Sequence, residues 1–285
     1  MPAKREDILM NSSIRSILHP TDLSSMSASA FAHALRIALA AQTKLYCLHV
    51  KESDSNGGSG FPDVRRLVAQ WGLLEEDEPL SAIDSAQGLG FENVTLGQRE
   101  PAEAIQRFLA EHVCDMVVLS THGRDGIDHW LNGSIAEAVF NVSAISTLFV
   151  PRGARGFVDQ VTGDLRLRHV LVPIDHSPKP DRAIETTRNF VQLLTGLKFE
   201  MQLLHVGSGA AAIHSSILQL EGSTPITIRY GNVVQTIVDA AIEYDVDLIC
   251  MPTAGHHGIL DDLRGSTTER VIRQAPCPVL AVRSA

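Results

Sequence analysis

The chain has 285 residues, of which 44% are apolar, 20% charged and only 5% aromatic. This length suggests about two domains, and the aliphatic composition is typical of a globular α/β protein and not of a disordered chain. The formal net charge of −9 argues against a protein whose main task is to cover nucleic acid or an anionic membrane, because both are polyanions. We therefore expect no nucleic-acid partner.

The cysteines and the N-terminus bear on the cellular compartment. Four cysteines lie far apart, within or beside apolar runs, and form no C-x-x-C pair: Cys47, Cys114, Cys250 and Cys277. We interpret them as buried thiols. The chain shows neither a cationic and then apolar leader nor an apolar run approaching about 18 residues. Together these features predict a cytoplasmic protein with no membrane span.

Strands and helices alternate along the first half of the chain. Residues 1–13 are polar, and we expect a flexible N-terminus there. Short apolar runs predict strands at 15–20, 44–50, 93–97, 116–120 and 147–150. Three-to-four spacing of apolar residues predicts helices after Asp22, at 63–88 with a break near Pro79, from Pro101 to about 112, and at 133–142.

The second half repeats the first. Ile17-Leu18-His19-Pro20-Thr21-Asp22 returns as Val170-Leu171-Val172-Pro173-Ile174-Asp175, 153 residues later. Gly133-Ser134 returns as Gly265-Ser266, only 132 residues later, so the second copy is shorter by 21 residues. The deficit falls between the second strand and the third helix, where only 210–220 remains of the second helix. Such a duplication predicts two similar domains in tandem.

We expect four segments: a flexible N-terminus at 1–13, a first domain at 14–152, a linker at 153–168 and a second domain at 169–285 with a shortened second helix. Alternating strands and helices favour a parallel sheet with helices on both faces. Ligands of such sheets bind at the carboxyl ends of the strands. The Pro-x-Asp turn and a glycine loop both lie there.

That glycine loop follows the fourth strand of the first half. Residues 120–123 read Ser-Thr-His-Gly, and nine residues further on Gly133-Ser134 opens the last helix. Glycines permit close backbone approach, and N–H groups at a helix start together with a hydroxyl can hold an anion. The pattern predicts a phosphate site. The alternative is that the glycines only shape the connection and Ser134 caps the helix.

The order of these motifs resembles the universal stress protein family. In that family the first strand ends in Pro-x-Asp, the second ends in Leu-His-Val, and a loop Gly-x2-Gly-x9-Gly-Ser/Thr precedes the last helix. The resemblance covers nearly the whole chain outside 1–13 and the linker. It implies two tandem Rossmann-like domains of the adenine nucleotide alpha-hydrolase-like type. Each would have a five-stranded parallel sheet of order 3-2-1-4-5, with helices on both faces.

The resemblance also implies ATP, with or without Mg²⁺, held without ready turnover. In the first half it assigns the ligand to Thr21, Asp22, Val50, Ser120, His122, Gly123, Gly133, Ser134 and Ile135. In the second half the matching positions are Asp175, Val206, Gly255, Gly265 and Ser266. By this comparison Asp22 and Val50 would lie around the adenosine, and the loop residues would line the phosphates.

Both halves depart from the family at the first glycine of the loop. Ser120 stands there in the first half, and it is small and keeps its N–H. Pro252 stands there in the second half, where it has no N–H to donate and a restricted φ. We therefore expect ATP mainly in the N-terminal half. The alternative for the second half is a structural partner without a ligand.

No catalytic residue is nominated, because neither half contains a nucleophile with a base that sequence can place beside it, and no P-loop is present. We interpret His256-His257 as part of a solvated loop and expect no metal site. The leading hypothesis is a non-catalytic stress or regulatory protein that binds an adenine nucleotide. The alternatives are a nucleotide-independent module for a protein or a small apolar ligand and, third, a slow ATP hydrolase.

The family usually dimerises through the last strand of each domain. In this chain 147–150 could pair with 279–282 and form an intrachain pseudo-dimer that protects two sheet edges. A further homodimer and a protein partner of unknown identity are compatible with this arrangement.

Overall fold

The computed structural model describes residues 14–51, 60–75, 77–97, 100–121, 145–208, 226–253 and 267–283. Its first half contains β1 (Ser16–Pro20), a short 3-10 turn, α2 (Ala28–Ala41), β2 (Lys44–Val50), α3 (Val64–Gln70), α4 (Ser81–Gln87), β3 (Gly90–Leu96), α5 (Pro101–Glu111), β4 (Met116–Ser120) and β5 (Ser146–Val150). The predicted break of the second helix is confirmed, since α3 and α4 are separate. The helix predicted at 133–142 lies outside the described residues.

The second half contains β6 (His169–Pro173), α8 (Asp181–Thr195), β7 (Glu200–Val206), β8 (Ile226–Arg229), α10 (Val233–Glu243), β9 (Leu248–Thr253), α12 (Thr267–Gln274) and β10 (Val279–Arg283). The shortened second helix predicted at 210–220 also lies outside the described residues. Local chemistry explains several boundaries. Asp63 caps α3 by accepting a hydrogen bond from the Arg66 N–H at 2.9 Å, and Pro101 opens α5, where no N–H is needed.

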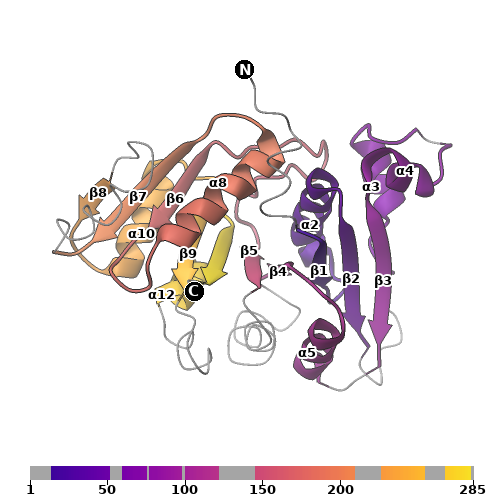
Figure 1. Cartoon of the computed structure of the whole chain (residues 1–285), viewed down its shortest axis with the longest axis horizontal. Helices are drawn as coiled ribbons and strands as arrows, with labels where there is room; N and C mark the ends of the chain where they lie inside the picture. The colour runs from indigo at the N-terminus through magenta and orange to yellow at the C-terminus, as the bar shows by residue number, and fades with distance from the viewer. Residues whose placement is uncertain are drawn as a thin grey trace.

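The ten strands form one sheet, in the order β3-β2-β1-β4-β5-β10-β9-β6-β7-β8. Each half has the predicted order 3-2-1-4-5, and every pairing within a half is parallel. The two halves lie side by side, with the N-terminal half in indigo to magenta and the C-terminal half in orange to yellow (Figure 1). The fold prediction of two tandem Rossmann-like units is confirmed.

The halves meet at β5 and β10, which pair antiparallel. Leu148 lies opposite Leu280, and both are fully buried. This pairing gives each strand a neighbour on the side that would otherwise be an open sheet edge. A continuous sheet therefore crosses the boundary between the two copies.

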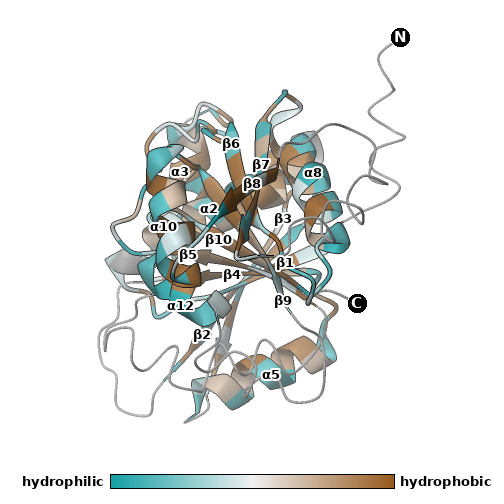
Figure 2. Cartoon of the chain, turned by 90° about the vertical axis from the view of Figure 1, so that its left-hand side faces the viewer, coloured by the Kyte–Doolittle hydropathy of each residue, from teal (hydrophilic) through white to brown (hydrophobic). Residues whose placement is uncertain are grey.

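Helices cover both faces of the sheet, and each face has one hydrophobic layer. The layer under α2, α3 and α8 contains residues from both halves, and so does the layer under α5, α10 and α12. The hydropathy colouring shows mostly hydrophobic residues along the strands and hydrophilic residues on helices such as α12 (Figure 2). The core is thus shared between the copies and not divided between them.

The segment predicted to be a linker, which we call the connecting segment (153–168), is packed and partly ordered by its own hydrogen bonds. Val158 and Leu165 form an antiparallel bridge, and the Arg166 N–H donates to the Phe157 carbonyl at 2.8 Å. Phe157 is fully buried. The segment therefore connects the two domains, as a linker does, and one aromatic residue anchors it in the core.

Candidate functional site

The carboxyl ends of three neighbouring strands bring together the predicted residues that the structure describes in the first half. Strand β1 lies between β2 and β4. Thr21 directly follows β1, Val50 ends β2, and Ser120 ends β4. The Thr21 N–H donates to the Leu48 carbonyl at 2.8 Å, which extends the β1–β2 ladder by one residue. These residues therefore share one edge of the sheet, as ligand sites of such sheets require.

The turn after β1 holds Asp22 in a defined position. Leu23 has φ of +58°, a left-handed conformation that is uncommon for a residue with a branched side chain. Its N–H donates to Thr21 Oγ1 at 3.0 Å. One carboxylate oxygen of Asp22, Oδ1, accepts hydrogen bonds from the Ser24 N–H at 2.9 Å and the Ser24 hydroxyl at 2.7 Å. Backbone strain at such a turn is a frequent property of functional sites.

The second carboxylate oxygen of Asp22, Oδ2, is buried. Oδ2 has no hydrogen-bond partner within the part of the chain that the structure describes. A buried carboxylate oxygen without a partner is costly, so this position favours a further donor beyond the described residues. Asp22 therefore has one oxygen fixed by its own turn and one oxygen able to accept a hydrogen bond.

Below the turn lies His19, which sequence analysis did not single out because it stands inside an apolar strand. The ring is fully buried, and Nδ1–H donates to the Val118 carbonyl at 2.9 Å. Nε2 has no partner among the described residues. Burial lowers the pKa of His19 to about 4, although the hydrogen bond to Val118 and the nearby charge of Asp22 oppose that shift. The imidazole is therefore neutral at pH 7.

A histidine contact is repeated in both halves. His49 Nδ1–H donates to the Thr21 carbonyl at 3.0 Å, and His205 Nδ1–H donates to the Ile174 carbonyl at 3.2 Å. Both contacts join the end of the second strand to the turn after the first. We interpret these histidines as structural residues that hold the turn.

The second half presents a more open turn. Asp175 is exposed, and its Oδ1 accepts a hydrogen bond from the neighbouring His176 N–H at 2.7 Å. Val206 ends β7 and is half-buried. Pro252 lies inside β9, opposite Val282 of β10, and is buried. Asp175 therefore lacks the burial and the serine contacts that position Asp22.

The remaining predicted residues lie outside the described residues. They are His122, Gly123, Gly133, Ser134 and Ile135 in the first half and Gly255, Gly265 and Ser266 in the second. The described part of the site thus contains Asp22 and Val50, which the resemblance assigns to the adenosine, and Ser120 at the start of the loop; the rest of the phosphate loop remains a prediction.

The buried thiols are expected to be unreactive. All four cysteines are buried and unpaired. Burial raises the pKa of the Cys47, Cys250 and Cys277 thiols to about 12 in each case. They are therefore protonated at neutral pH and unsuited to nucleophilic attack.

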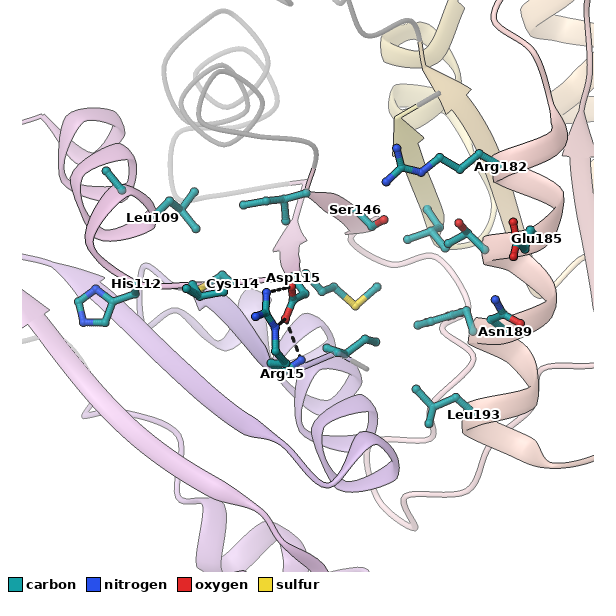
Figure 3. Close-up of a pocket in the computed structure, with 18 of the residues that line it drawn as sticks. Arg15, Leu109, His112, Cys114, Asp115, Ser146, Arg182, Glu185, Asn189 and Leu193 are labelled. Atoms are coloured by element: carbon teal, nitrogen blue, oxygen red, sulfur yellow. Dashed lines mark hydrogen bonds and ion pairs between the residues drawn. The ribbon is translucent and has the colours of Figure 1, made fainter. Parts of the chain in front are cut away.

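A separate cavity of about 680 Å³ lies between the halves, away from the Asp22 turn. Figure 3 shows Leu109, Cys114, Asp115 and Ser146 facing α8, which presents Arg182, Glu185, Asn189 and Leu193. The amino ends of β4 and β5 reach this cavity, so it lies at the opposite edge of the first-half sheet from Asp22. Two of its lining residues, Arg15 and Asp115, form an ion pair at 3.0 Å.

Within the described residues, no helix is both long enough and apolar enough to span a membrane.

Comparison with known proteins supplies the family. The model of the Universal stress protein family matches residues 13–151 and 210–283. A universal stress protein of Methanocaldococcus jannaschii is 24% identical over 170 residues, which cover 50% of this chain and 90% of that protein. A solved universal stress protein of Archaeoglobus fulgidus has a TM-score of 0.63 at 22% identity and covers 96% of this chain and 97% of its own. A functionally unknown protein of Pseudomonas aeruginosa also has a TM-score of 0.63, at 14% identity, covering 98% and 95%.

Proposed function

Since the chain belongs to the universal stress protein family, we propose that it is a cytoplasmic stress-response protein that binds ATP, chiefly in its N-terminal half, without efficient turnover. The observation that carries this proposal is Asp22, whose buried Oδ2 has no hydrogen-bond partner among the described residues. The amino group of an adenine would donate a hydrogen bond to this oxygen. Thr21 and Val50 lie at the same edge of the sheet and would contact the nucleoside.

The difference between the halves supports a single main site. Asp22 is half-buried and oriented by Ser24, whereas Asp175 is exposed. A ligand that bound Asp175 would compete with water for the carboxylate, so its hydrogen bond would contribute less net free energy. In the second half Pro252 also offers no N–H to a phosphate.

Isothermal titration calorimetry with ATP and with ATP plus Mg²⁺ tests the proposal, together with analysis of nucleotide released from the denatured protein. We expect about one ATP per chain. Gly123→Val, which adds a branched side chain where the family brings backbone to phosphate, should abolish the binding. Gly97→Val is a suitable control, because no atom lies within 4 Å of the Cβ position of Gly97. Gly163→Val is not, because a Cβ atom at Gly163 would lie 2.6 Å from the Trp71 ring. The proposal would be refuted if calorimetry detected no ATP binding and the denatured protein released no adenine nucleotide.

The cavity between the halves gives a location for the alternative function, a nucleotide-independent module that binds a protein or a small apolar ligand. Its volume of about 680 Å³ lies in the range of roughly 300–1,000 Å³ common for small-molecule sites. Phe190 and Leu193 of α8 and Leu109 of α5 contribute apolar surface. Charged side chains such as Arg182 and Glu185 also line the cavity, so a ligand there would need polar groups as well. A fluorescent apolar probe should bind there whether or not ATP is present, and Leu193→Glu should weaken that binding. ATP-dependent probe binding, or binding unchanged by the substitution, would speak against this alternative.

A further inference from the structure

The connecting segment touches both halves of the protein. On one side its backbone and Phe157 contact His33 of α2. On the other side Phe157 packs edge-on against Phe190 of α8, with ring centroids 6.2 Å apart. Phe157 is therefore a wedge between the first helices of the two copies. Its position links the connecting segment to the contact between the halves.

Both ring nitrogens of His33 form hydrogen bonds with backbone groups, and Nε2 binds the segment at Phe157 and Val158. Nδ1–H donates to the Ser29 carbonyl at 2.7 Å, which leaves Nε2 as an acceptor. Nε2 accepts from the Phe157 N–H at 3.0 Å and from the Val158 N–H at 3.3 Å. One neutral tautomer therefore satisfies three backbone groups. A protonated ring could not, because its Nε2–H would face two other donors.

The His33 ring is closely packed against Gly156 and Phe157. A Cβ atom at Gly156 would lie 2.3 Å from His33 Cε1, so the segment requires glycine at this position. The His33 and Phe157 rings meet edge to face, with centroids 4.4 Å apart. The ring is fully buried. A charged imidazole here would be buried with no acceptor for its second N–H among the contacts described, which is unfavourable.

Other contacts hold the middle of the segment and its two ends. Trp71 Nε1–H donates to the Gln160 carbonyl at 3.2 Å, and the Trp71 ring packs closely against Gly163. Arg155 and Arg166 both form ion pairs with Asp245 of the second half. These contacts do not depend on the protonation of a histidine. Loss of the His33 contacts would therefore free Phe157 and Val158 first.

We propose that His33 and the connecting segment form an acid-sensitive latch, in which protonation of the imidazole releases Phe157 from between α2 and α8 and loosens the contact between the two halves. The latch is independent of nucleotide, since none of its residues lies at the Asp22 turn. It would let cytoplasmic acidification change how the two copies are held together.

Burial explains the direction of the response. Burial lowers the pKa of His33 to about 4, and the hydrogen bond to Ser29 only partly opposes it. No charged group contributes to this shift: neither Arg36 on α2, nor Asp159 or Asp164 in the segment, nor Arg188 on α8. In an open segment the imidazole would return toward its ordinary pKa of about 6.5. The open form therefore binds protons more readily, and its population rises as the pH falls below about 6.5.

Hydrogen exchange measured by mass spectrometry, at pH 7.5 and 5.5 and corrected for intrinsic exchange rates, tests the latch on the full chain. With the two pKa values above, the opening equilibrium constant of peptides from 153–168 should rise about tenfold between these pH values. Peptides from β6 should change less. His33→Gln retains an acceptor oxygen but does not titrate, so the pH effect on the segment should vanish.

His169→Gln is the matched control, because His169 lies directly after the segment but contacts Glu200 and not Phe157. It should keep the tenfold effect. If His33→Gln does not fold, Gly156→Ala replaces it: the added methyl would collide with His33, and the segment should exchange faster already at pH 7.5. Segment protection that is equal at both pH values in the unmodified protein, or a tenfold effect that persists in His33→Gln, would overturn the latch.

Discussion

The turns after the first strand of each half have the same backbone contacts but different surroundings. The Thr21 N–H bonds to the Leu48 carbonyl, and the Ile174 N–H bonds to the Leu204 carbonyl, both at 2.8 Å. Yet Asp22 is half-buried and bound by Ser24, whereas Asp175 is exposed. Duplication preserved the sheet geometry, which packing enforces, while the side chains that make a site diverged.

The same divergence affects buried histidines. His19 of β1 corresponds to Val172 of β6, and both side chains are fully buried. His33 lies in the first half as well. Because burial lowers the pKa of both histidines to about 4, acid should destabilise the first half more than the second.

The largest effect concerns pH. Unfolding returns His19 and His33 toward a pKa of about 6.5, so the unfolded chain binds more protons between pH 6.5 and 4. Their contribution to stability is complete above pH 6.5 and is lost as the pH falls toward 4. The expected loss is about 3 kcal/mol per histidine. Urea denaturation at several pH values should show that His19→Val, which copies Val172, flattens this dependence. An unchanged slope in that variant would contradict the buried-histidine explanation.

The second effect concerns two corresponding carboxylates. Asp247 is 2% exposed and accepts hydrogen bonds from the Arg168 and His169 N–H groups at 2.8 and 3.0 Å. Asp115 is 28% exposed and accepts from the Arg15 N–H at 2.8 Å. Asp247→Ala leaves buried donors unpaired and should cost about 3 kcal/mol of unfolding free energy, whereas Asp115→Ala should cost about 1 kcal/mol. Chemical denaturation of both variants measures the difference, and equal losses would show that burial does not decide it.

The third effect concerns ATP. Asp22→Ala removes the carboxylate that the proposed site uses and should weaken ATP binding about 10- to 100-fold, the value expected for a hydrogen bond to a charged group. Asp175→Ala should leave the measured affinity and stoichiometry unchanged. Calorimetry on both variants compares the halves directly. Equal losses of affinity in the two variants would mean that both halves bind.

The smallest effect concerns the ends of α2 and α8. Both helices end on a residue in the left-handed conformation, which is Gln42 with φ of +50° in α2 and Gly196 with φ of +61° in α8. A side chain is unfavourable in this conformation. Gln42→Gly should therefore stabilise the protein by up to about 1 kcal/mol, and Gly196→Ala should destabilise it by about 1 kcal/mol. Thermal denaturation measures both changes in stability. Changes of the same sign in the two variants would contradict the explanation from the left-handed conformation.

Sequence reasoning located most strands well. The predictions at 44–50 and 116–120 match β2 and β4 to the residue. Buried parallel strands are continuous apolar runs, so their ends coincide with the first polar or turn-forming residue. The third strand was predicted too short, because β3 starts at Gly90 and is half-exposed, and its apolar pattern is weak.

Only part of the candidate site could be predicted from the sequence. The Pro-x-Asp motif identified Asp22, since a motif is local. His19 and the buried Oδ2 of Asp22 could not be found, because burial and missing partners depend on residues from β4 and α2 that are distant in the chain. Sequence likewise indicated that the two halves have unequal sites but could not show that Asp175 is exposed.

The sequence by itself determined the duplication, the alternation of strands and helices, and the family, because these follow from local periodicity and short motifs. The tertiary structure alone decided how the copies are joined: the pairing of Leu148 with Leu280, the burial of Phe157, and the contact between His33 and Phe157 across 124 residues. A charged segment such as 153–168 is predicted to be solvated when each residue is considered singly. One buried aromatic ring and one satisfied imidazole outweigh that tendency, because apolar burial and paired polar groups contribute to stability only when the distant partners are in place.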